Sequence, residues 1–301
     1  MPEPIHYTHC PACLSASVYP VLSASDHTVS HKTFEIWHCE DCTLRFTQNA
    51  PAAADIGPYY QSADYVSHSD TQQGIINRLY HRVRKHTLHA KRKLLQEVTG
   101  KETGALLDVG AGTGAFANEM QEAGWEITGF EPDAIARENA GRKYGLQLLP
   151  PDELYELQGE KFDAITLWHV LEHVHDLHGY LEKFYSILKP GGVLVIAVPN
   201  YTSYDAKKYR ANWAAYDVPR HLYHFSPKSM LQLVTGKGFI AGKMHPMWFD
   251  GYYVSMLSEK YLTGSGNLPG AVLTGFISNL KASRNVGRCS SVIYTFSKKI
   301  A

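Results

Sequence analysis

From Gly104 onward, short apolar runs alternate with amphipathic segments along the chain. Seven of these runs predict strands, at 105–110, 126–131, 146–149, 162–168, 193–198, 238–249 and 290–299. Helical segments that close on glycine lie between the earlier runs, at 115–124, 136–145 and 177–192. Such alternation predicts a mostly parallel sheet with helices on both of its faces.

The segments that flank this pattern differ from it. Residues 1–50 hold short β-prone runs such as TFEIWHC and LRFTQ, and 48–58 is rich in Pro, Ala and Gly, as linkers are. A loosely periodic apolar stripe predicts a long helix from about Gln72 to Val98. We expect 250–289, between the last two predicted strands, to form a cap or an interface of helical and irregular structure.

The overall composition adds little that is specific. The 301 residues are 44% hydrophobic and 19% charged, as in an ordinary soluble globular protein. Lys+Arg and Asp+Glu both number 29, so no global field directs the chain toward nucleic acid or an anionic membrane. The N-terminus has no apolar signal core, and the longest strongly apolar run, at 193–198, is too short to span a bilayer. A cytoplasmic protein without a membrane span is therefore expected.

The predicted long helix is locally basic. No acidic residue lies between Asp70 and Glu97, whereas seven Lys and Arg residues do. We interpret this segment as a solvated helix face, because the whole chain is neutral. Contact with an anionic ligand or with RNA is the alternative.

Four of the five cysteines form two C-x2-C pairs, at Cys10, Cys13, Cys39 and Cys42. This spacing favours a metal site over disulfides, because two such pairs can direct four thiolates toward one point. Four thiolates leave no open position for water, so the expected zinc is structural. It would stabilise a segment that is too small to build its own core. Two redox pairs or unrelated cysteines are the alternative.

The segment LLDVGAGTGAF combines a strand, a turn and the start of a helix. Gly110, Gly112 and Gly114 permit a tight turn and a close approach of a ligand to the backbone. The start of the helix suits a carboxylate or a phosphate. Glu131 ends the next strand, where it could accept hydrogen bonds from both hydroxyls of a ribose, although a plain surface carboxylate is the alternative. This pattern predicts a cofactor that carries a nucleoside.

The motifs LLDVGAGTG, GFEPD, FDAITLWHVLEHVHD and LKPGGVLVIAVPN occur in the order and spacing of class I S-adenosylmethionine-dependent methyltransferases. The chain resembles this family over roughly 106–200, and the closing pair of strands extends the likeness to the C-terminus. The resemblance implies an α/β, Rossmann-like fold with a seven-stranded, mostly parallel sheet and an antiparallel C-terminal strand. It implies that S-adenosylmethionine binds at Asp108, Gly110, Gly112, Gly114, Glu131, Pro132, Asp152, Trp168 and His169.

A competing motif lies within the same stretch. His169-Val-Leu-Glu172-His173 matches the H-x-x-E-H pattern of inverted zinc metalloproteases. A protease would need this motif within one helix, whereas the preceding DAITLW is strand-like. We therefore expect a structural role for Glu172 and His173. A divalent metal near a similar Glu-His pair, as in some quinone-pathway O-methyltransferases that resemble this chain, is the alternative.

The segment YDVPRHLYHFS (216–226) resembles an HEHLxYFS-like segment of deoxysugar C-methyltransferases, which carry a related zinc module. His221 matches its second histidine, but Pro219 and Arg220 replace the first histidine and the glutamate, which puts carbon methylation in doubt. His221 is the expected general base, because imidazole titrates near neutrality, and a histidine that only packs the loop is the alternative. Tyr216 is the second catalytic candidate, as an aromatic side chain that could shield a cation.

Together, these patterns predict a zinc-ribbon module at 1–50, a linker and basic cap helix at 51–100, and an S-adenosylmethionine-binding domain at 101–301 with a cap insertion at about 250–289. The expected reaction is in-line methyl transfer to a small-molecule acceptor, such as a sugar or sugar nucleotide. The alternatives are an RNA methyltransferase that uses the zinc module and the basic helix, and a non-catalytic binding protein with a cofactor fold. Neither the atom methylated nor the oligomeric state follows from the sequence.

Overall fold

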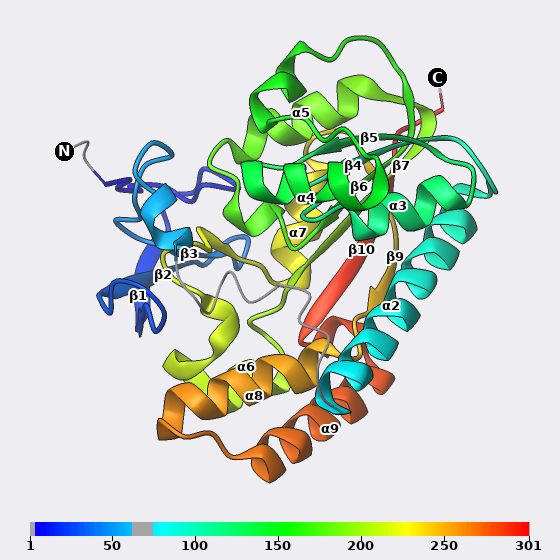
Figure 1. Cartoon of the computed structure of the whole chain (residues 1–301). Coiled ribbons are helices and arrows are strands. Elements are labelled where there is room, and N and C mark those ends of the chain that lie inside the picture. The colour runs from blue at the N-terminus through cyan, green and yellow to red at the C-terminus, as the bar shows by residue number, and fades with distance from the viewer. Residues whose placement is uncertain (1–3, 62–74, 301) are drawn as a thin grey trace.

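Two sheets form the framework of the molecule. The computed structural model describes residues 4–61 and 75–300, and the side chains of all of these except 75–84. The large sheet carries helices on both faces, and the small sheet lies beside it toward the N-terminus (Figure 1). The predicted helix and linker region includes residues 62–74, which lie outside the described part.

The large sheet has the order β5-β4-β6-β7-β10-β9. Its strands are β4 (Ala105–Val109), β5 (Glu126–Phe130), β6 (Phe162–Trp168), β7 (Leu188–Pro199), β9 (Ile240–Pro246) and β10 (Ser291–Ser297). β4 is parallel to β5 and β6, β6 is parallel to β7, and β10 runs antiparallel to both of its neighbours. The predicted Rossmann-like α/β fold with an antiparallel C-terminal strand is confirmed.

The predicted number of seven strands is wrong for the described residues, because this sheet has six. The missing strand is the run at 146–149, which makes only an isolated bridge between Leu149 and Phe130. Pro150 and Pro151 follow directly and cannot donate backbone hydrogen bonds to a ladder. The chain therefore enters a 3-10 turn at Pro151–Glu156 instead of extending the sheet.

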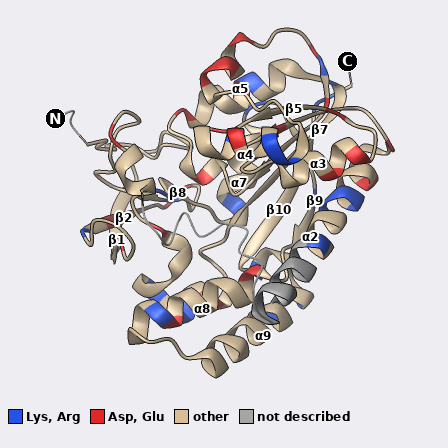
Figure 2. Ribbon diagram, in the orientation of Figure 1, with Lys and Arg blue, Asp and Glu red and all other residues tan. Residues whose placement is uncertain are grey.

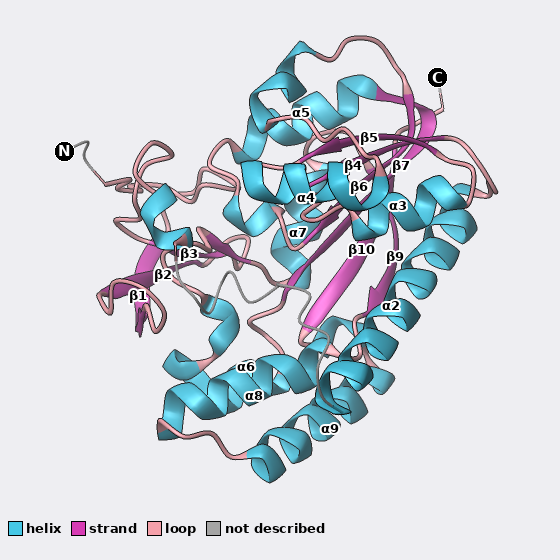
Figure 3. Ribbon diagram, in the orientation of Figure 1, coloured by secondary structure: helices cyan, strands magenta, loops and turns pink. Residues whose placement is uncertain are grey.

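Helices cover both faces of the large sheet (Figure 3): α2 (Ile75–Thr99), α3 (Ala115–Glu122), α4 (Ala134–Tyr144), α5 (Leu177–Ile187) and α7 (Pro227–Thr235). The helices α6 (Tyr204–Tyr209), α8 (Asp250–Thr263) and α9 (Leu268–Arg284) pack together beyond one end of the sheet. In β7, Leu194 and Ile196 pack into one core with α5 and α7, whereas Val193 and Val195 pack into another with α2 and α3. This period of two separates the two faces.

Local sequence signals set several helix ends. The Asp133 carboxylate accepts hydrogen bonds from the amides of Ile135 and Ala136 and so begins α4. α4 ends at Gly145, whose φ of 68° places it in the left-handed region. Ser226 and Ser229 form a capping box at the start of α7.

The small sheet is antiparallel and joins distant parts of the chain. Its order is β1 (Val18–Ser25), β2 (Thr33–Cys39), β3 (Arg45–Thr47) and β8 (Tyr223–His224). β8 comes from the second half of the chain, begins two residues after His221, and pairs with β3. The N-terminal module and the 216–226 loop are therefore parts of one sheet.

No helix in the part of the chain that the structure describes is both long enough and apolar enough to cross a membrane.

Candidate cofactor and acceptor site

The glycine turn lies between β4 and α3. Gly110, Gly112 and Gly114 have φ values of 68°, 56° and 77°, all in the region that favours glycine. A Cβ at Gly110 would lie 2.4 Å from Cγ2 of Val170, whereas a Cβ at Gly112 would enter open space. Gly110 therefore allows the turn to pack closely against Val170, and Gly112 leaves the backbone accessible to a ligand. Gly114 is the N-cap of α3.

The Glu131 carboxylate connects this turn to the end of β5. Its Oε2 accepts a hydrogen bond of 2.7 Å from the Gly112 amide, and its Oε1 accepts one of 2.9 Å from the Asp133 amide. Burial raises the pKa of Glu131, although both amides oppose this effect. Each oxygen retains acceptor capacity for a ribose hydroxyl. The carbonyl of Pro132 accepts a hydrogen bond from Arg137, and Asp152 lies exposed in the 3-10 turn.

Asp108 and Lys91 place opposite charges close to the turn. Asp108 is buried near the end of β4 and accepts a hydrogen bond of 2.7 Å from Thr166, and burial raises its pKa to about 7. Lys91 extends from α2, and its Nζ lies 4.1 Å from the centroid of the Trp168 ring. Burial lowers the pKa of Lys91 to about 8, against the influence of Asp108 and Asp250. The predicted solvated helix face is therefore wrong for Lys91, which is half-buried over an indole.

Trp168 ends β6 and forms one wall of this region. The edge of the Phe116 ring meets it at 5.3 Å between centroids and 76° between planes. Its Nε1 is buried and has no hydrogen-bond partner within the described residues. The Lys91 ammonium over its π-face shows that this wall accepts a cation.

His169 is held between two carboxylates. Its Nδ1 lies 3.3 Å from Oε1 of Glu172, and its Nε2 lies 3.0 Å from Oδ2 of Asp250. Burial lowers the pKa of His169, but the Asp250 and Glu172 carboxylates outweigh it and raise this pKa to about 10. His169 is therefore an imidazolium that ties the end of β6 to the start of α8.

Glu172, His173 and His221 come together in a buried cluster, defined here as the acid–histidine cluster. One ligand atom of each lies within 4.8 Å of those of the other two. Both Glu172 oxygens are buried, and Oε1 forms the ion pair with His169, whereas Oε2 has no hydrogen-bond partner among the described residues. Burial lowers the pKa of His173 to about 4, so His173 is neutral. Two imidazoles and a carboxylate can accept a proton or hold a divalent cation.

His221 is oriented by the loop that carries it. Its Nδ1 lies 2.9 Å from the carbonyl oxygen of Ala215, and this distance assigns the proton to Nδ1. Its Nε2 then carries a lone pair and lies 3.9 Å from Oδ2 of Asp217. The ring meets that of His173 edge-on, with 4.5 Å between centroids. This nitrogen is available to accept a proton.

The H-x-x-E-H motif does not lie on one helix. His169 follows the end of β6 with a φ of 58°, whereas Glu172 and His173 belong to a 3-10 turn at Leu171–His173. The expectation against a metalloprotease thus agrees with the observed geometry. The sequence reasoning missed that Glu172 and His173 meet His221, because residues 48 apart along the chain give no periodic signal.

The small sheet fixes the position of the His221 backbone. Thr47 donates a hydrogen bond of 2.6 Å from Oγ1 to the His221 carbonyl, and its amide donates one of 2.9 Å to Leu222. The Leu222 amide in turn donates to the carbonyl of Glu172 at 2.8 Å. Hydrogen bonds therefore link the N-terminal module to the 216–226 loop and to the acid–histidine cluster.

Tyr216 contacts the small sheet. Its hydroxyl accepts a hydrogen bond of 2.8 Å from Nη1 of Arg45, and burial raises its pKa. The ring lies between those of Trp213 and His224, with centroids 5.2 Å and 5.0 Å away. In this structure Tyr216 connects the loop to β3, and its catalytic role stays a prediction.

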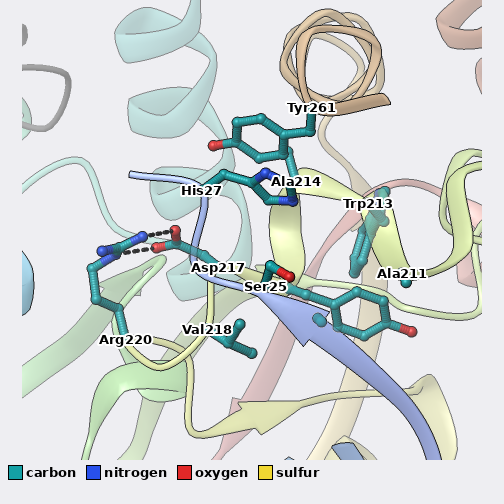
Figure 4. A pocket seen from close by; sticks show the side chains of 11 residues that line it. Ser25, His27, Ala211, Trp213, Ala214, Asp217, Val218, Arg220 and Tyr261 are labelled. Carbon is teal, nitrogen blue, oxygen red and sulfur yellow. Dashed lines mark hydrogen bonds and ion pairs between the residues drawn. The ribbon is translucent and has the colours of Figure 1, made fainter. Parts of the chain in front are cut away.

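A small pocket lies next to the same loop (Figure 4). Asp217 and Arg220 pair through two hydrogen bonds, of 2.9 Å and 2.5 Å, at its edge. On the opposite side the rings of His27 and Tyr261 stack with 4.1 Å between centroids. Because Asp217 also faces His221, this pocket adjoins the acid–histidine cluster.

The four N-terminal cysteines converge. Their Sγ atoms all lie within 4.8 Å of one another, with 3.5 Å between Cys10 and Cys42 and between Cys13 and Cys39. Tetrahedral zinc with Zn–S bonds of about 2.3 Å separates sulfurs by about 3.8 Å. All four thiols are free of disulfides, so the cluster is compatible with zinc.

The chain is similar to known methyltransferases. The profile of a family described as a methyltransferase domain matches residues 80–240, more than half of the chain. A ubiquinone biosynthesis O-methyltransferase of Ruegeria pomeroyi is 28% identical over 48% of this chain and 66% of its own length. One from a Chelativorans species is 36% identical over 32% of this chain and 41% of its own length. The chain thus spans less than two thirds of both relatives. A solved SAM dependent methyltransferase from Archaeoglobus fulgidus is 18% identical with a TM-score of 0.49, over 71% of this chain and 94% of that one.

The chain therefore belongs to the methyltransferase domain family. The methyltransferase domain that the sequence predicts is thus confirmed.

Proposed function

We propose that the protein transfers the methyl group of S-adenosylmethionine to a hydroxyl of a small-molecule acceptor, with His221 as the general base. The observation that carries this proposal is the buried acid–histidine cluster, in which Nε2 of His221 has its lone pair available beside Asp217. The relatives' designation as O-methyltransferases supports an oxygen acceptor. A sugar or sugar-nucleotide acceptor stays a prediction from the resemblance alone.

The cofactor is proposed to lie across the carboxyl ends of β4, β5 and β6. Glu131 would accept hydrogen bonds from the ribose hydroxyls, and Asp108 would attract the methionine ammonium. The methionine carboxylate would lie between the start of α3 and Lys91. Adenine would contact the segment of Pro132 and Asp152, and Trp168 would face the sulfonium.

The proposed reaction is a single displacement. The acceptor oxygen forms a bond to the methyl carbon while the carbon–sulfur bond breaks, and its electron pair returns to the sulfur, which becomes a neutral thioether. The hydroxyl proton passes to Nε2 of His221, and Asp217 stabilises the imidazolium that results. Because the sulfonium is already activated, alignment of oxygen, carbon and sulfur supplies most of the acceleration.

The four-cysteine cluster is proposed to hold one structural zinc. Four thiolates fill a tetrahedral coordination sphere, so the ion would stabilise the fold and provide no catalytic position. We expect metal analysis of the purified protein to find one zinc per chain, and the Cys39→Ser variant to lose it. A wild-type protein that is free of zinc and still folded would contradict this part of the proposal.

The role of His221 is tested by the His221→Gln variant. Loss of the general base is expected to lower the methyl-transfer rate roughly 100-fold or more. The affinity for S-adenosylmethionine, measured by calorimetry, is expected to be unchanged. Small-molecule hydroxyl acceptors and RNA would be compared by detecting S-adenosylhomocysteine.

The matched control is His245→Gln, on β9 and outside the acid–histidine cluster. This variant should keep the wild-type rate. A His221→Gln enzyme that transfers methyl groups within threefold of the wild type would contradict the assignment. Transfer to RNA but to no small molecule would favour the alternative of an RNA methyltransferase.

A further inference from the structure

In α9 the large apolar side chains lie on the exposed face and not on the buried face, unlike in an ordinary surface helix. Its buried residues are small or polar: Ala271, Thr274, Gly275, Ser278 and Ala282. Its large apolar residues are about half exposed or more, between 49% and 63%: Leu268, Val272, Leu273, Phe276 and Leu280. A helix against a protein core normally has the opposite arrangement. The outer face of α9, defined here by these five large residues, has no covering element among the described residues.

Small residues on the inner side allow α8 and α9 to pack closely. A Cβ at Gly275 would lie 2.6 Å from the Tyr252 ring, and one at Gly251 would lie 3.3 Å from Asn279. The two helices lie side by side at the edge of the molecule away from β5 (Figure 1). Close packing through small residues with large apolar residues outside is typical of helices that meet lipid.

The charges around this face have one sign. No Asp or Glu follows Glu259 in the chain, whereas six Lys and Arg residues do. Lys281, Arg284 and Arg288 are exposed at the C-terminal end of α9 and just beyond it. Glu259 itself is buried and accepts a hydrogen bond from Tyr209. Figure 2 shows that the α9 ribbon is largely without acidic residues.

An exposed tryptophan completes this surface. The Trp248 carbonyl accepts a hydrogen bond of 2.8 Å from Nδ2 of Asn279 on α9, and 41% of Trp248 is exposed. Tryptophan is enriched where an apolar phase meets water. The face thus combines an apolar row, a flanking tryptophan and cations, without an exposed carboxylate on α9.

These features distinguish between two occupants. A second copy of this chain would place the same face against itself about a two-fold axis, and its α9 would offer no acidic residue to pair with Lys281 and Arg284. A membrane with anionic headgroups suits both the cations and the apolar row, because its headgroups attract the cations and its acyl chains accept the apolar side chains. The neutral overall charge of the chain does not oppose this, because the asymmetry is local.

We propose that the outer face of α9 docks the protein on the surface of an anionic lipid bilayer. The helix lies in the interface and does not span the bilayer. His169 at the site is paired with Asp250, the first residue of α8, so docking would place the methyltransferase site near the membrane surface. The docking itself does not depend on which acceptor is methylated.

The test is co-sedimentation of the full-length protein with vesicles of phosphatidylcholine alone and of phosphatidylcholine with phosphatidylglycerol. We expect binding to the anionic vesicles and at least tenfold weaker binding to the neutral ones. The double variant Leu273→Asp with Phe276→Asp should lose binding at least tenfold. Lys281→Gln and Arg284→Gln should each weaken it roughly fivefold.

The control is Ile135→Asp, which introduces the same charge at another exposed apolar residue, on α4. It should bind vesicles like the wild type. All variants should bind S-adenosylmethionine normally, which separates a docking defect from misfolding and from failure of the proposed function. Equal binding of the double variant, or no binding of the wild type to either vesicle, would overturn the proposal. A wild-type dimer that becomes monomeric in the double variant, without vesicle binding, would establish a second copy as the occupant.

Discussion

At the scale of single residues, the candidate cofactor site is controlled by charges that the protein holds out of water. Asp108 and Lys91 have opposite charges in the same region, and burial moves their pKa values toward each other, to about 7 and about 8. S-adenosylmethionine carries an ammonium, a sulfonium and a carboxylate. The ammonium suits Asp108, and the carboxylate suits Lys91.

The Lys91→Met variant tests this assignment. Loss of a buried, charge-assisted contact is expected to weaken cofactor binding about tenfold, or about 1.4 kcal/mol. S-adenosylmethionine and S-adenosylhomocysteine should be affected equally in calorimetry, because both carry the carboxylate. Lys93→Met, on an exposed residue of the same helix, is the matched control. Tighter binding of S-adenosylmethionine alone would instead identify Lys91 as a repulsive neighbour of the sulfonium.

The pH dependence of binding follows from the same two groups. The pKa of Asp108 is raised, so its negative charge is lost as the pH falls through about 7. The pKa of Lys91 is lowered, so its positive charge is lost as the pH rises through about 8. Cofactor affinity should therefore be greatest between these values. In the Lys91→Met variant, the decrease in cofactor affinity above pH 8 should be smaller than in the wild type. The decrease in affinity below pH 7 should remain.

The sequence identified the residues near the glycine turn but not Lys91. The turn is local, because Gly110, Gly112 and Gly114 follow one strand directly. The position of Lys91 depends instead on how α2 packs against α3 and the sheet. A basic helix in a neutral chain gives no signal for which of its cations is buried. Which of these cations is buried is determined by the tertiary packing of α2.

At the scale of elements, the small sheet supports the loop at 216–226, which carries the proposed base His221. β8 connects the sheet to this loop, because it begins two residues after His221 and pairs with β3. From sequence, the cysteine spacing predicted a metal module, but nothing local showed that the 216–226 loop would complete its sheet. The two-residue β8 is too short to give a periodic signal, and its partner lies in the first fifty residues.

The Thr47→Val variant tests this support. It keeps the shape of the side chain and removes the hydroxyl that donates to the His221 carbonyl. The buried acceptor left unpaired should cost about 1–3 kcal/mol of the free energy of unfolding. The methyl-transfer rate should fall severalfold while cofactor affinity is unchanged, because the cofactor residues lie on the large sheet.

Thr33→Val is the matched control, because Thr33 is an exposed β2 residue of the same sheet. It should leave both the stability and the rate at wild-type values. A Thr47→Val enzyme with a normal rate and reduced stability would show that the small sheet stabilises the fold without positioning the base.

At the scale of the whole molecule, the predicted architecture holds because alternation and helix ends are encoded locally. The mostly parallel sheet and the antiparallel β10 agree with what the resemblance implies, and the error in strand number arose at the Pro150-Pro151 pair. The cap was predicted only as helical and irregular sequence at 250–289. The exposed apolar face of α9 could not be read from the sequence, since an apolar stripe does not show which side the protein covers.

The most direct test of the central claim is a crystal structure of the protein with S-adenosylhomocysteine bound. We expect the ribose hydroxyls on the Glu131 carboxylate, the amino group toward Asp108, and the carboxylate within hydrogen-bond reach of Nζ of Lys91. We also expect the sulfur beside Trp168, facing the acid–histidine cluster. A ligand bound elsewhere, or one whose ribose makes no contact with Glu131, would contradict the proposed site.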